Sequence, residues 1–450
     1  MAESRQLWAP QAWIGGRWRD AVVLDIGADG CWASLTPGTA PPQGAERLAG
    51  AVLPGLVDAH SHAFQRAFVG LAERRQGGHD DFWSWRDCMY QVALRITPQA
   101  LRDIASQLYG ELLAGGYTQV CEFHYLHHDE AGQRHADPAT MSWMLADAAA
   151  EAGIGLTLLP ALYERAGFRA DALREDQRRF RAGVDDVLAL QAAVRGAGRS
   201  LLDCGVAVHS LRAARPETLQ TLAAHSHGPL HIHVAEQTAE VDECLSVTGC
   251  RPIEWLLRHA APDARWQLVH ATHAEPAEID GVARCGAGVV LCPGTEANLG
   301  DGLSDLPRWL AAGVPLSLGS DSQVTRDWPQ EVRWLEYGQR LMRRQRNVGA
   351  DPPQQPATAA RLFERLLAGG AAAAGFERWG LMPGARADML VIDEADPALA
   401  GMPSSHRLDA IVFAAPERPF SRVMVAGRWV TLRDESRLEA HRRALQLLQP

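Results

Sequence analysis

The alternation of short apolar segments with longer helix-like stretches constrains the fold of this chain more than any other feature of its sequence. Eight apolar segments can be marked, at 52–60, 119–127, 154–162, 204–211, 230–236, 265–272, 288–294 and 315–322. The stretches between them carry helix signals, such as the proline near the start and the glycine at the end of 98–116. A strand followed by a helix, repeated eight times, is typical of a (β/α)8 TIM-type barrel in the α/β class. A doubly wound open sheet is the alternative, but polar residues gather at the segment ends, which favours the closed barrel.

The two ends of the chain differ from its middle. Short strand-like pieces with turn signals occur in 8–52 and again at 380–393, 408–415 and 421–432. We therefore predict a small β-sandwich domain built from both termini, residues 1–53 and 380–436. The barrel is expected at 54–379, and residues 437–450 are expected to form a solvated amphipathic helix. A length of 450 residues fits one large barrel with a smaller companion.

Composition excludes several classes of function. The net charge of −10 disfavours a nucleic acid or an anionic membrane as partner. No apolar run is long enough to cross a bilayer, and the N-terminus lacks a signal-peptide pattern, so a cytoplasmic location is expected. All 44 Lys and Arg residues are arginine, which excludes a Schiff-base lysine, a P-loop lysine and a metal pair bridged by a carboxylated lysine. The 8 cysteines form no CxxC pair, so neither a disulfide framework nor a cysteine-rich zinc site is expected.

Candidate metal ligands stand at the ends of the predicted strands. His60 and His62 are separated by one residue, which puts both side chains on one face of a strand. His233 closes the fifth predicted strand, His270 the sixth and Asp321 the eighth, and barrel chemistry occurs at these carboxyl ends. We predict that the ligands listed next hold one divalent metal ion: His60, His62, His233 and Asp321. Imidazole and carboxylate ligands suit Zn²⁺ best, with Fe²⁺ and Mn²⁺ as alternatives.

His231 is an alternative ligand from the fifth segment. Positions 231 and 233 share one face of the strand, so spacing alone does not separate them. We prefer His233 because it lies nearer the mouth of the barrel.

Five motifs resemble those of the amidohydrolase superfamily. They are PGLVDAHSH, HIHVAE, LVHATH, LGSDS and PGARADMLVID, and the resemblance to the superfamily covers essentially the whole chain. The spacing of His233 and Glu236, with no lysine on the fourth strand, looks like that of the mononuclear deaminases in this superfamily.

A narrower resemblance is to the family of formimidoylglutamate deiminases. It is carried by HSHAFQRAFVGL, DFWSWRDCMY, EFHYLHH, VHSLRA, LCPGTEANLGDG, LGSDSQV and EVRWLEYGQRL. Gly294 departs from the family pattern, which has threonine there, and it is expected to loosen the loop without removing a ligand. This resemblance implies metal-dependent hydrolysis of N-formimino-L-glutamate to N-formyl-L-glutamate and ammonia in histidine degradation. It also implies a homodimer.

The reaction assigns hypothetical roles to three residues. A metal lowers the pKa of its bound water to about 7, and the departing nitrogen must receive protons. We expect Asp321 to bind the metal and accept the water proton, and His270 to orient the hydroxide and share the role of base. We expect Glu236 to protonate the imino nitrogen.

The implied substrate is a small anionic amino acid, and an acidic protein needs local cations to hold its carboxylates. Arginine binds a carboxylate through two parallel hydrogen bonds, which makes Arg86 and Arg212 the best candidates. Arg86 stands among aromatic residues in the long loop 61–97. Further hydrogen bonds to the substrate are expected from Gln65, Tyr125 and His209. Residues 295–302 are expected either to line the pocket or to form a glycine-terminated turn.

Two other functions remain open from the sequence. A nucleobase or nucleoside deaminase on the same barrel would share every metal residue and Glu236, but it would recognise a base rather than two carboxylates. A non-catalytic scaffold would keep the barrel, yet such a protein typically loses ligands, and here every proposed ligand is present.

Overall fold

The computed structural model describes residues 5–75, 80–415 and 418–448. Residues 1–4 and 416–417 of the predicted small domain, 76–79 of the aromatic loop and 449–450 of the predicted C-terminal helix lie outside the described residues.

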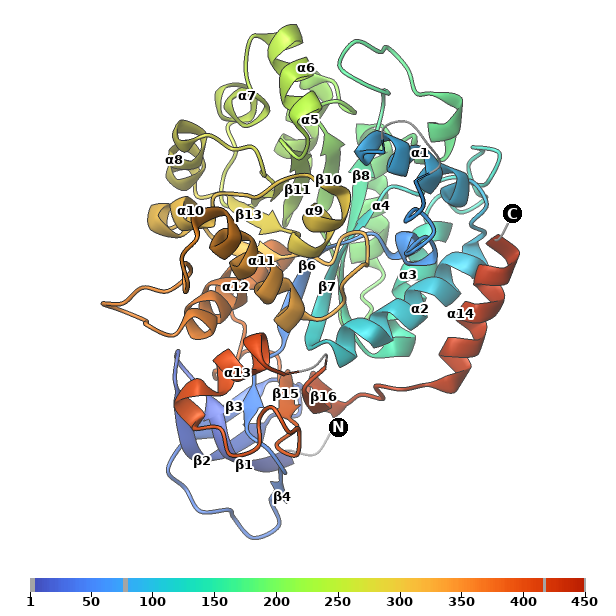
Figure 1. The fold of residues 1–450 in the computed structure, drawn as a ribbon. Helices are drawn as coiled ribbons and strands as arrows, with labels where there is room; N and C mark the ends of the chain where they lie inside the picture. The colour runs from blue at the N-terminus through green and yellow to red at the C-terminus, as the bar shows by residue number, and fades with distance from the viewer. Residues whose placement is uncertain (1–4, 76–79, 416–417, 449–450) are drawn as a thin grey trace.

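Within these ranges, eight parallel strands close into a barrel (Figure 1). The strands are β6 (Leu56–Ser61), β7 (Tyr117–His124), β8 (Gly155–Leu162), β10 (Val206–Ser210), β11 (Leu230–Val234), β12 (Trp266–His270), β13 (Gly288–Leu291) and β14 (Leu316–Leu318). The eighth strand pairs with the first through Leu318 and Asp58, which closes the sheet. A short strand, β9 (Leu202–Cys204), pairs with β8 just before β10 begins. The predicted barrel is confirmed, and each strand overlaps one of the predicted apolar segments.

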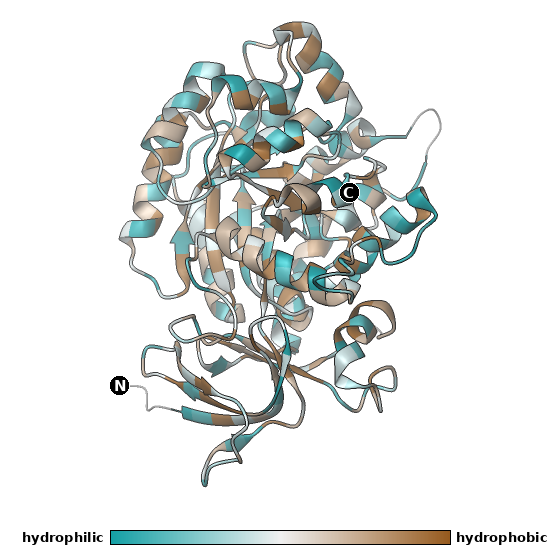
Figure 2. Cartoon of the chain, turned by 90° about the vertical axis from the view of Figure 1, so that its left-hand side faces the viewer, coloured by the Kyte–Doolittle hydropathy of each residue, from teal (hydrophilic) through white to brown (hydrophobic). Residues whose placement is uncertain are grey.

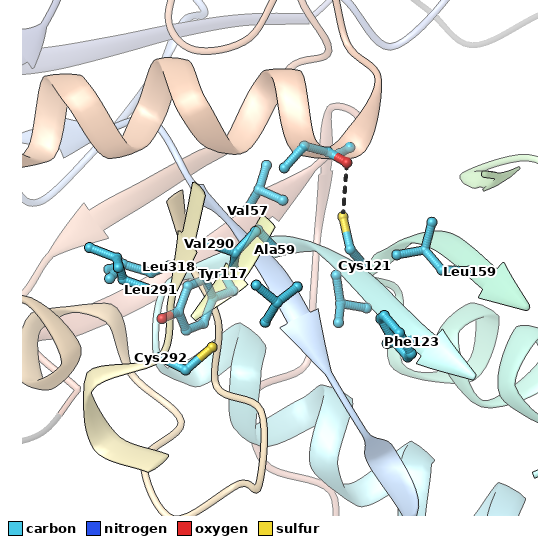
Figure 3. Close-up of a cluster of buried hydrophobic side chains, with 14 of the residues drawn as sticks. Val57, Ala59, Tyr117, Cys121, Phe123, Leu159, Val290, Leu291, Cys292 and Leu318 are labelled. Carbon is cyan, nitrogen blue, oxygen red and sulfur yellow. Dashed lines mark hydrogen bonds between the residues drawn. The ribbon is translucent and has the colours of Figure 1, made fainter. Parts of the chain in front are cut away.

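The barrel strands are buried on both faces, which explains their nearly continuous apolar runs. Every residue of β7 and of β8 is buried. Figure 2 shows mostly hydrophobic strands inside a ring of helices that mix hydrophilic and hydrophobic residues. Figure 3 shows part of this interior, where Val57, Phe123, Leu159 and Leu318 lie among other buried side chains.

Helices surround the barrel and cover its ends. They are α1 (Phe82–Ala93), α2 (Pro98–Ala114), α3 (Thr140–Ala152), α4 (Val184–Gly196), α5 (Pro216–His225), α6 (Thr238–Thr248), α7 (Pro252–His259), α8 (Pro276–Cys285), α9 (Pro293–Leu299), α10 (Leu306–Ala312), α11 (Trp328–Arg343) and α12 (Thr358–Ala374). The short 3-10 helices η1 (Ala63–Ala67), η2 (Glu175–Phe180) and η3 (Ser404–His406) lie in connections. The helix predicted in 98–116 begins as expected, because Thr97 caps the Ala100 amide and Pro98 takes the first helical position.

The C-terminal end of α12 is held by side chains of the barrel. The Ala373 carbonyl accepts hydrogen bonds from Cys121 Sγ (3.7 Å; Figure 3) and His231 Nε2 (2.9 Å), and the Ala374 carbonyl accepts one from Thr157 Oγ1 (3.3 Å). These bonds satisfy carbonyls that the last turn of a helix leaves without intrahelical partners. His231, the alternative ligand, therefore contacts a helix end and is absent from the metal cluster described below.

Both ends of the chain build a separate sheet, as predicted (Figure 1). Its strands are β1 (Arg5–Trp13), β2 (Trp18–Ile26), β3 (Trp32–Thr36), β4 (Glu46–Arg47), β5 (Val52–Leu53), β15 (Met389–Ile392), β16 (Phe420–Val425) and β17 (Arg428–Trp429). The two halves join where β15 pairs with β5. Because β5 ends three residues before β6 begins, this sheet adjoins the amino ends of the barrel strands.

One predicted strand is wrong. Residues 408–415 form most of helix α13 (Arg407–Phe413) and the turn after it. A short apolar run does not distinguish a strand from a buried helix, and tertiary contacts decide between them. Asp409 accepts a hydrogen bond from the Ala359 amide at the start of α12, and Arg333 of α11 donates to the Val412 carbonyl. The packing against α11 and α12 thus selects the helix.

The C-terminal helix, α14 (Glu435–Leu448), lies along α2 (Figure 1). It is less solvated than predicted, because Arg437, His441, Ala444 and Leu448 are buried. Among the described residues, none of the helices has the length and apolar character needed to cross a membrane. The cytoplasmic location stays a prediction.

Candidate metal centre and active site

The four predicted metal ligands come together at the carboxyl end of the barrel. His60 lies in β6, His62 directly follows that strand, His233 lies in β11 and Asp321 follows β14. One ligand atom from each lies within 4.8 Å of those from the other three, and all four residues are buried. The strand ends bring them together because neighbouring parallel strands end at the same edge.

The spacing of these atoms fits a single cation. The Nε2 atoms of the three histidines are 3.1 Å (His60 to His62), 3.3 Å (His62 to His233) and 3.0 Å (His233 to His60) apart. Asp321 Oδ1 is 3.4 Å from Nε2 of both His60 and His62. A tetrahedral site with metal–nitrogen bonds of about 2.0–2.1 Å separates its ligands by about 3.3 Å. The residues therefore fit a metal ion of the size of Zn²⁺.

Backbone carbonyls fix the tautomers of two ligands. His62 Nδ1 donates to the Phe123 carbonyl at 2.9 Å, and His233 Nδ1 donates to the His209 carbonyl at 2.8 Å. Each bond leaves the lone pair on Nε2, which faces the centre of the cluster. Burial lowers the pKa of His60 to about 3 and also lowers those of His62 and His233, so the imidazoles stay neutral.

Two buried carboxylates that the sequence reasoning missed hold the end of β6. Asp58 accepts hydrogen bonds from the amide (2.9 Å) and hydroxyl (2.5 Å) of Ser320, the residue before Asp321. Glu122 of β7 accepts from Ser61 Oγ at 2.8 Å and from the Ala63 amide at 2.6 Å. The strand carrying His60 is thus tied to its neighbours on both sides. A carboxylate inside a predicted apolar strand is the sequence signal that points to such a role.

His270 lies between three carboxylates. Its Nε2 atom is 3.6 Å from Glu236 Oε1 and 3.7 Å from Asp321 Oδ2, and its Nδ1 atom is 3.4 Å from Glu296 Oε1. Glu296 also accepts a hydrogen bond from the Cys292 amide at 2.9 Å, so its carboxylate is fixed. The sequence reasoning did not single out Glu296.

The electrostatics of this group favour proton exchange. Burial raises the pKa of Glu236 to about 7; Asp321 adds to this effect, whereas His270 and Arg212 oppose it. Burial lowers the pKa of His270, but the charges on Glu236, Glu296 and Asp321 outweigh it and bring the value to about 10. For Asp321, burial raises the pKa, yet the hydrogen bond from His60 and the charge of His270 bring it below its usual range.

The backbone is strained at the same residues. His270 has a φ of +68° and Asp321 a φ of +49°, a region that residues other than glycine rarely adopt. Such strain is concentrated at functional sites, where surrounding contacts hold it in place.

A pocket opens above the metal cluster, and the five predicted substrate-binding residues all line it. Its lining comprises His62, Gln65, Phe82, Trp85, Arg86, Met89, Tyr90, Tyr125, His209, Arg212, His233, Glu236, His270, Leu299 and Asp321. Gln65 Nε2 donates to the Tyr125 hydroxyl at 3.2 Å. Burial lowers the pKa of His209 well below its ordinary value, so this imidazole is neutral.

Two arginines enter the pocket around one tryptophan. The guanidinium of Arg86 is 4.7 Å from the Trp83 ring centroid, and that of Arg212 is 5.6 Å from the same ring. Arg212 is buried, with 6% exposure. The Nε atoms of both arginines are buried without a hydrogen-bond partner in the part of the chain that is described. The pocket therefore offers two guanidinium groups with unused donors.

Residues 295–302 combine both predicted arrangements. They form most of α9, which ends at Gly300 with a φ of +71°, while Leu299 lines the pocket and Glu296 contacts His270. The position of Gly294 is tightly packed rather than loose. A Cβ atom there would lie 2.3 Å from Thr325 Oγ1, and the Gly294 amide donates to Glu331 Oε2 at 2.8 Å.

Known proteins resemble the chain over nearly its whole length. Formimidoylglutamate deiminase from Pseudomonas aeruginosa is 48% identical over 431 residues, which are 94% of each chain. A 5-methylthioadenosine/S-adenosylhomocysteine deaminase from Natronomonas pharaonis is 26% identical and covers 88% of this chain and 87% of its own. The crystal structure of an amidohydrolase from Brucella melitensis superposes with a TM-score of 0.93 at 39% identity, covering 99% of both chains.

The model of the amidohydrolase family matches residues 51–430, which include the barrel and every residue of the site. This family is metal-dependent, in agreement with the buried cluster of three histidines and one aspartate. The chain is therefore a member of the amidohydrolase family.

Proposed function

We propose that this chain is an enzyme that hydrolyses N-formimino-L-glutamate to N-formyl-L-glutamate and ammonia, a step of histidine degradation. The observation that carries the proposal is a pocket with a metal-binding cluster at its floor and two arginines in its wall. The 48% identity to a relative named formimidoylglutamate deiminase supports the same substrate.

We propose Zn²⁺ as the single resident metal, held by His60, His62, His233 and Asp321. Three neutral imidazoles and one carboxylate suit this ion, and the ligand spacing agrees with its bond lengths. When bound, the cation lowers the pKa of a coordinated water to about 7 and thereby supplies a nucleophile at neutral pH.

The side chains around the cluster divide the proton transfers. Asp321 Oδ2 lies 3.7 Å from His270 Nε2. Asp321, whose lowered pKa keeps it ionised, is the proposed acceptor of the proton of the nucleophile, and His270, whose raised pKa keeps it protonated, is proposed to orient the nucleophile. Glu236, at 3.6 Å from the same nitrogen, is the proposed donor to the departing nitrogen. Its raised pKa of about 7 suits a group that must be protonated at one stage and ionised at another.

The reaction balances with one water per turnover. The water oxygen bonds to the formimino carbon, the bond from that carbon to its terminal nitrogen breaks, and the nitrogen leaves as ammonia with the transferred protons. The new carbonyl oxygen remains in N-formyl-L-glutamate.

The substrate carboxylates are proposed to bind Arg86 and Arg212. Each guanidinium has donors free within the described structure, and stacking on Trp83 fixes the orientation of both groups. Gln65, Tyr125 and His209 line the remaining polar wall and are proposed to hydrogen-bond the substrate. The homodimer implied by the resemblance stays a prediction.

The test is ammonia release by the metal-loaded protein from N-formimino-L-glutamate, compared with adenosine, guanine and cytosine at equal concentration. We expect release from the formimino compound alone, with N-formyl-L-glutamate identified by mass spectrometry. Release from a nucleobase or nucleoside, with none from the formimino compound, would instead establish the alternative deaminase.

A further inference from the structure

Helix α1, which carries Arg86, is fastened to the barrel by a segment that none of the chemistry above uses. This segment is residues 174–180, named here the strap, in the long connection between β8 and α4. The strap is itself anchored to the barrel end. Its Arg179 carbonyl accepts from the amides of His127 (3.0 Å) and His128 (3.1 Å), which follow β7.

Gln177 forms the central link between the strap and α1. Its side chain is 1% exposed, and Nε2 donates to the Tyr163 hydroxyl at 3.0 Å and to the Tyr90 hydroxyl at 3.4 Å. Its Oε1 atom accepts from the Arg174 amide at 3.0 Å, so the amide group is fixed within the strap. Tyr163 directly follows β8, whereas Tyr90 belongs to α1. One buried amide thus joins the arginine-bearing helix to the barrel, beside a direct contact of 3.4 Å between the hydroxyls of Tyr90 and Tyr163.

The link reaches Arg86 through one turn of helix. Tyr90 and Arg86 are four residues apart, so their side chains lie on the same face of α1. The Arg86 guanidinium lies 5.4 Å from the Tyr90 ring centroid. A shift of Tyr90 would therefore move the surface against which the guanidinium rests.

Two further contacts from the strap act on the same helix. Arg174 Nη2 is 3.1 Å from Asp87 Oδ1, whereas Arg86 Nη2 is 3.7 Å from that oxygen, so Arg174 makes the closer contact. Arg174 thus ties Asp87, the neighbour of Arg86 in α1, to the strap. The guanidinium of Arg179, which is fully buried, donates to the Ala93 carbonyl at the end of α1.

We infer that Gln177 is a positioning residue for substrate affinity: through Tyr90 it holds Arg86 where a substrate carboxylate binds. The inference rests on the proposed function, which supplies the substrate. Its geometry comes from the contacts of the strap. It predicts an effect on KM with little effect on kcat, because Gln177 touches neither the metal ligands nor the proton-transfer groups.

The test compares Gln177→Met with Gln191→Met in the metal-loaded protein. Gln191 is the matched control: it is also buried, at 4% exposure, and its Nε2 donates to the His227 carbonyl at 2.8 Å, but it lies in α4. We expect Gln177→Met to raise KM for N-formimino-L-glutamate about tenfold, which corresponds to the loss of about one hydrogen bond between Arg86 and the substrate carboxylate. The value of kcat should stay within about threefold of that of the parent protein. Metal content should be unchanged, and hydrogen exchange of 82–93 should be faster. Gln191→Met should leave KM and this exchange unchanged.

Unchanged KM and unchanged exchange of α1 in Gln177→Met would overturn the inference. If Gln177→Met does not fold, Tyr90→Phe breaks the same link from the other side, and an unaltered KM in that variant has the same meaning. If the parent protein releases no ammonia from the formimino compound, the proposed function fails, and the exchange comparison still decides the role of the strap. Faster exchange in Gln177→Met alone supports that role, and equal exchange in both variants contradicts it.

Discussion

At the scale of single residues, the site separates the three neutral histidine ligands from the side chains that exchange protons. Burial keeps His60, His62 and His233 uncharged, so their Nε2 lone pairs are available to a cation. The groups that exchange protons, Glu236 and His270, lie beside this cluster and have pKa values displaced in the opposite direction. The two sets of side chains therefore lend themselves to separate tests.

Glu236→Gln should lower kcat by about 10²–10⁴-fold, because the amide keeps the size of the side chain but cannot deliver a proton. Metal content, measured by plasma mass spectrometry, should equal that of the parent protein. Glu243→Gln on α6 is the control and should leave kcat unchanged. A kcat near the parent value in Glu236→Gln would remove this residue from the reaction.

Arg212→Lys should raise KM at least tenfold while changing kcat much less, since lysine keeps the charge but loses the planar pair of donors. Steady-state kinetics on N-formimino-L-glutamate measure the split. Arg442→Lys, at an exposed position of α14, is the control. Equal KM in the two variants would mean that Arg212 does not bind a carboxylate.

The ligand residues were predictable because their signal is local. Two histidines two residues apart on a strand share a face, and a strand end in a barrel points to the mouth. Asp58 and Glu296 were not predictable in this way, because they act through backbone amides and imidazoles supplied by other strands. The strap residue Gln177 carries no motif at all, and only its contacts reveal it.

At the scale of helices and strands, the distance between packed elements decides which positions tolerate a side chain. Gly369 of α12 packs on β14, where a Cβ atom would lie 1.9 Å from the Leu316 carbonyl oxygen. At Gly196, the last residue of α4, a Cβ atom would have no neighbour within 4 Å among the described residues outside its own helix turn. Two helical glycines thus occupy opposite environments.

Gly369→Ala should destabilise the protein by about 1–3 kcal/mol, because the clash exceeds the gain in helix propensity. Gly196→Ala should be neutral or stabilise by up to about 1 kcal/mol. Thermal unfolding of both variants under one set of conditions measures the difference. A melting temperature for Gly369→Ala at or above that of Gly196→Ala would contradict the described packing of α12.

Glu111 of α2 links two loops of the barrel mouth. Its carboxylate pairs with Arg66 after β6 (2.9 Å) and with Arg326 after β14 (2.8 Å). Burial raises the pKa of Glu111, but the hydrogen bond and charge of Arg66, together with Arg326, outweigh it and lower the value to about 2. A lowered pKa in the folded state stabilises the protein above the unfolded value and ceases to do so as the pH falls to the folded value.

The stability difference between the parent protein and Glu111→Gln should therefore be constant near neutral pH and shrink between pH 4.5 and 2. We expect roughly 3 kcal/mol at pH 7, measured by chemical denaturation across this range. Glu151→Gln breaks an exposed pair with Arg102 and should show a difference below about 1 kcal/mol. If the stability difference between the parent protein and Glu111→Gln grew as the pH falls, the lowered pKa of Glu111 in the folded state would be refuted.

Most elements could be predicted from periodicity, and the exceptions have a physical cause. The eight barrel strands are continuous apolar runs between helix signals, and all were expected. Residues 408–415 are also an apolar run, but contacts with α11 and α12 make them helical. Those contacts join parts of the chain that are distant in sequence, so local pattern does not contain them.

At the scale of the whole molecule, the metal site and the small sheet adjoin opposite ends of the barrel strands. The small sheet joins the amino end, where β5 leads into β6, and the cluster lies at the carboxyl end (Figure 1). The four ligands come from the first, fifth and eighth strands, so a cation among them links parts of the barrel that are far apart in sequence. The stability of the barrel and its metal content should therefore be coupled.

Removal of the metal with a chelator should lower the melting temperature, and stoichiometric Zn²⁺ should restore it. A cation at 100 times its dissociation constant adds about 2.7 kcal/mol to the stability of a folded state that alone binds it. Differential scanning calorimetry of the parent protein and of His233→Ala measures the effect. Equal melting temperatures with and without metal in the parent protein would contradict the coupling.

The most direct measurement is an anomalous difference map of the crystallised protein, collected above and below the zinc absorption edge. The account predicts one peak, within about 2.0–2.2 Å of Nε2 of His60, His62 and His233 and of a carboxylate oxygen of Asp321. A peak held by other residues, or none after reconstitution with Zn²⁺, would contradict the claim that these four side chains form the metal centre.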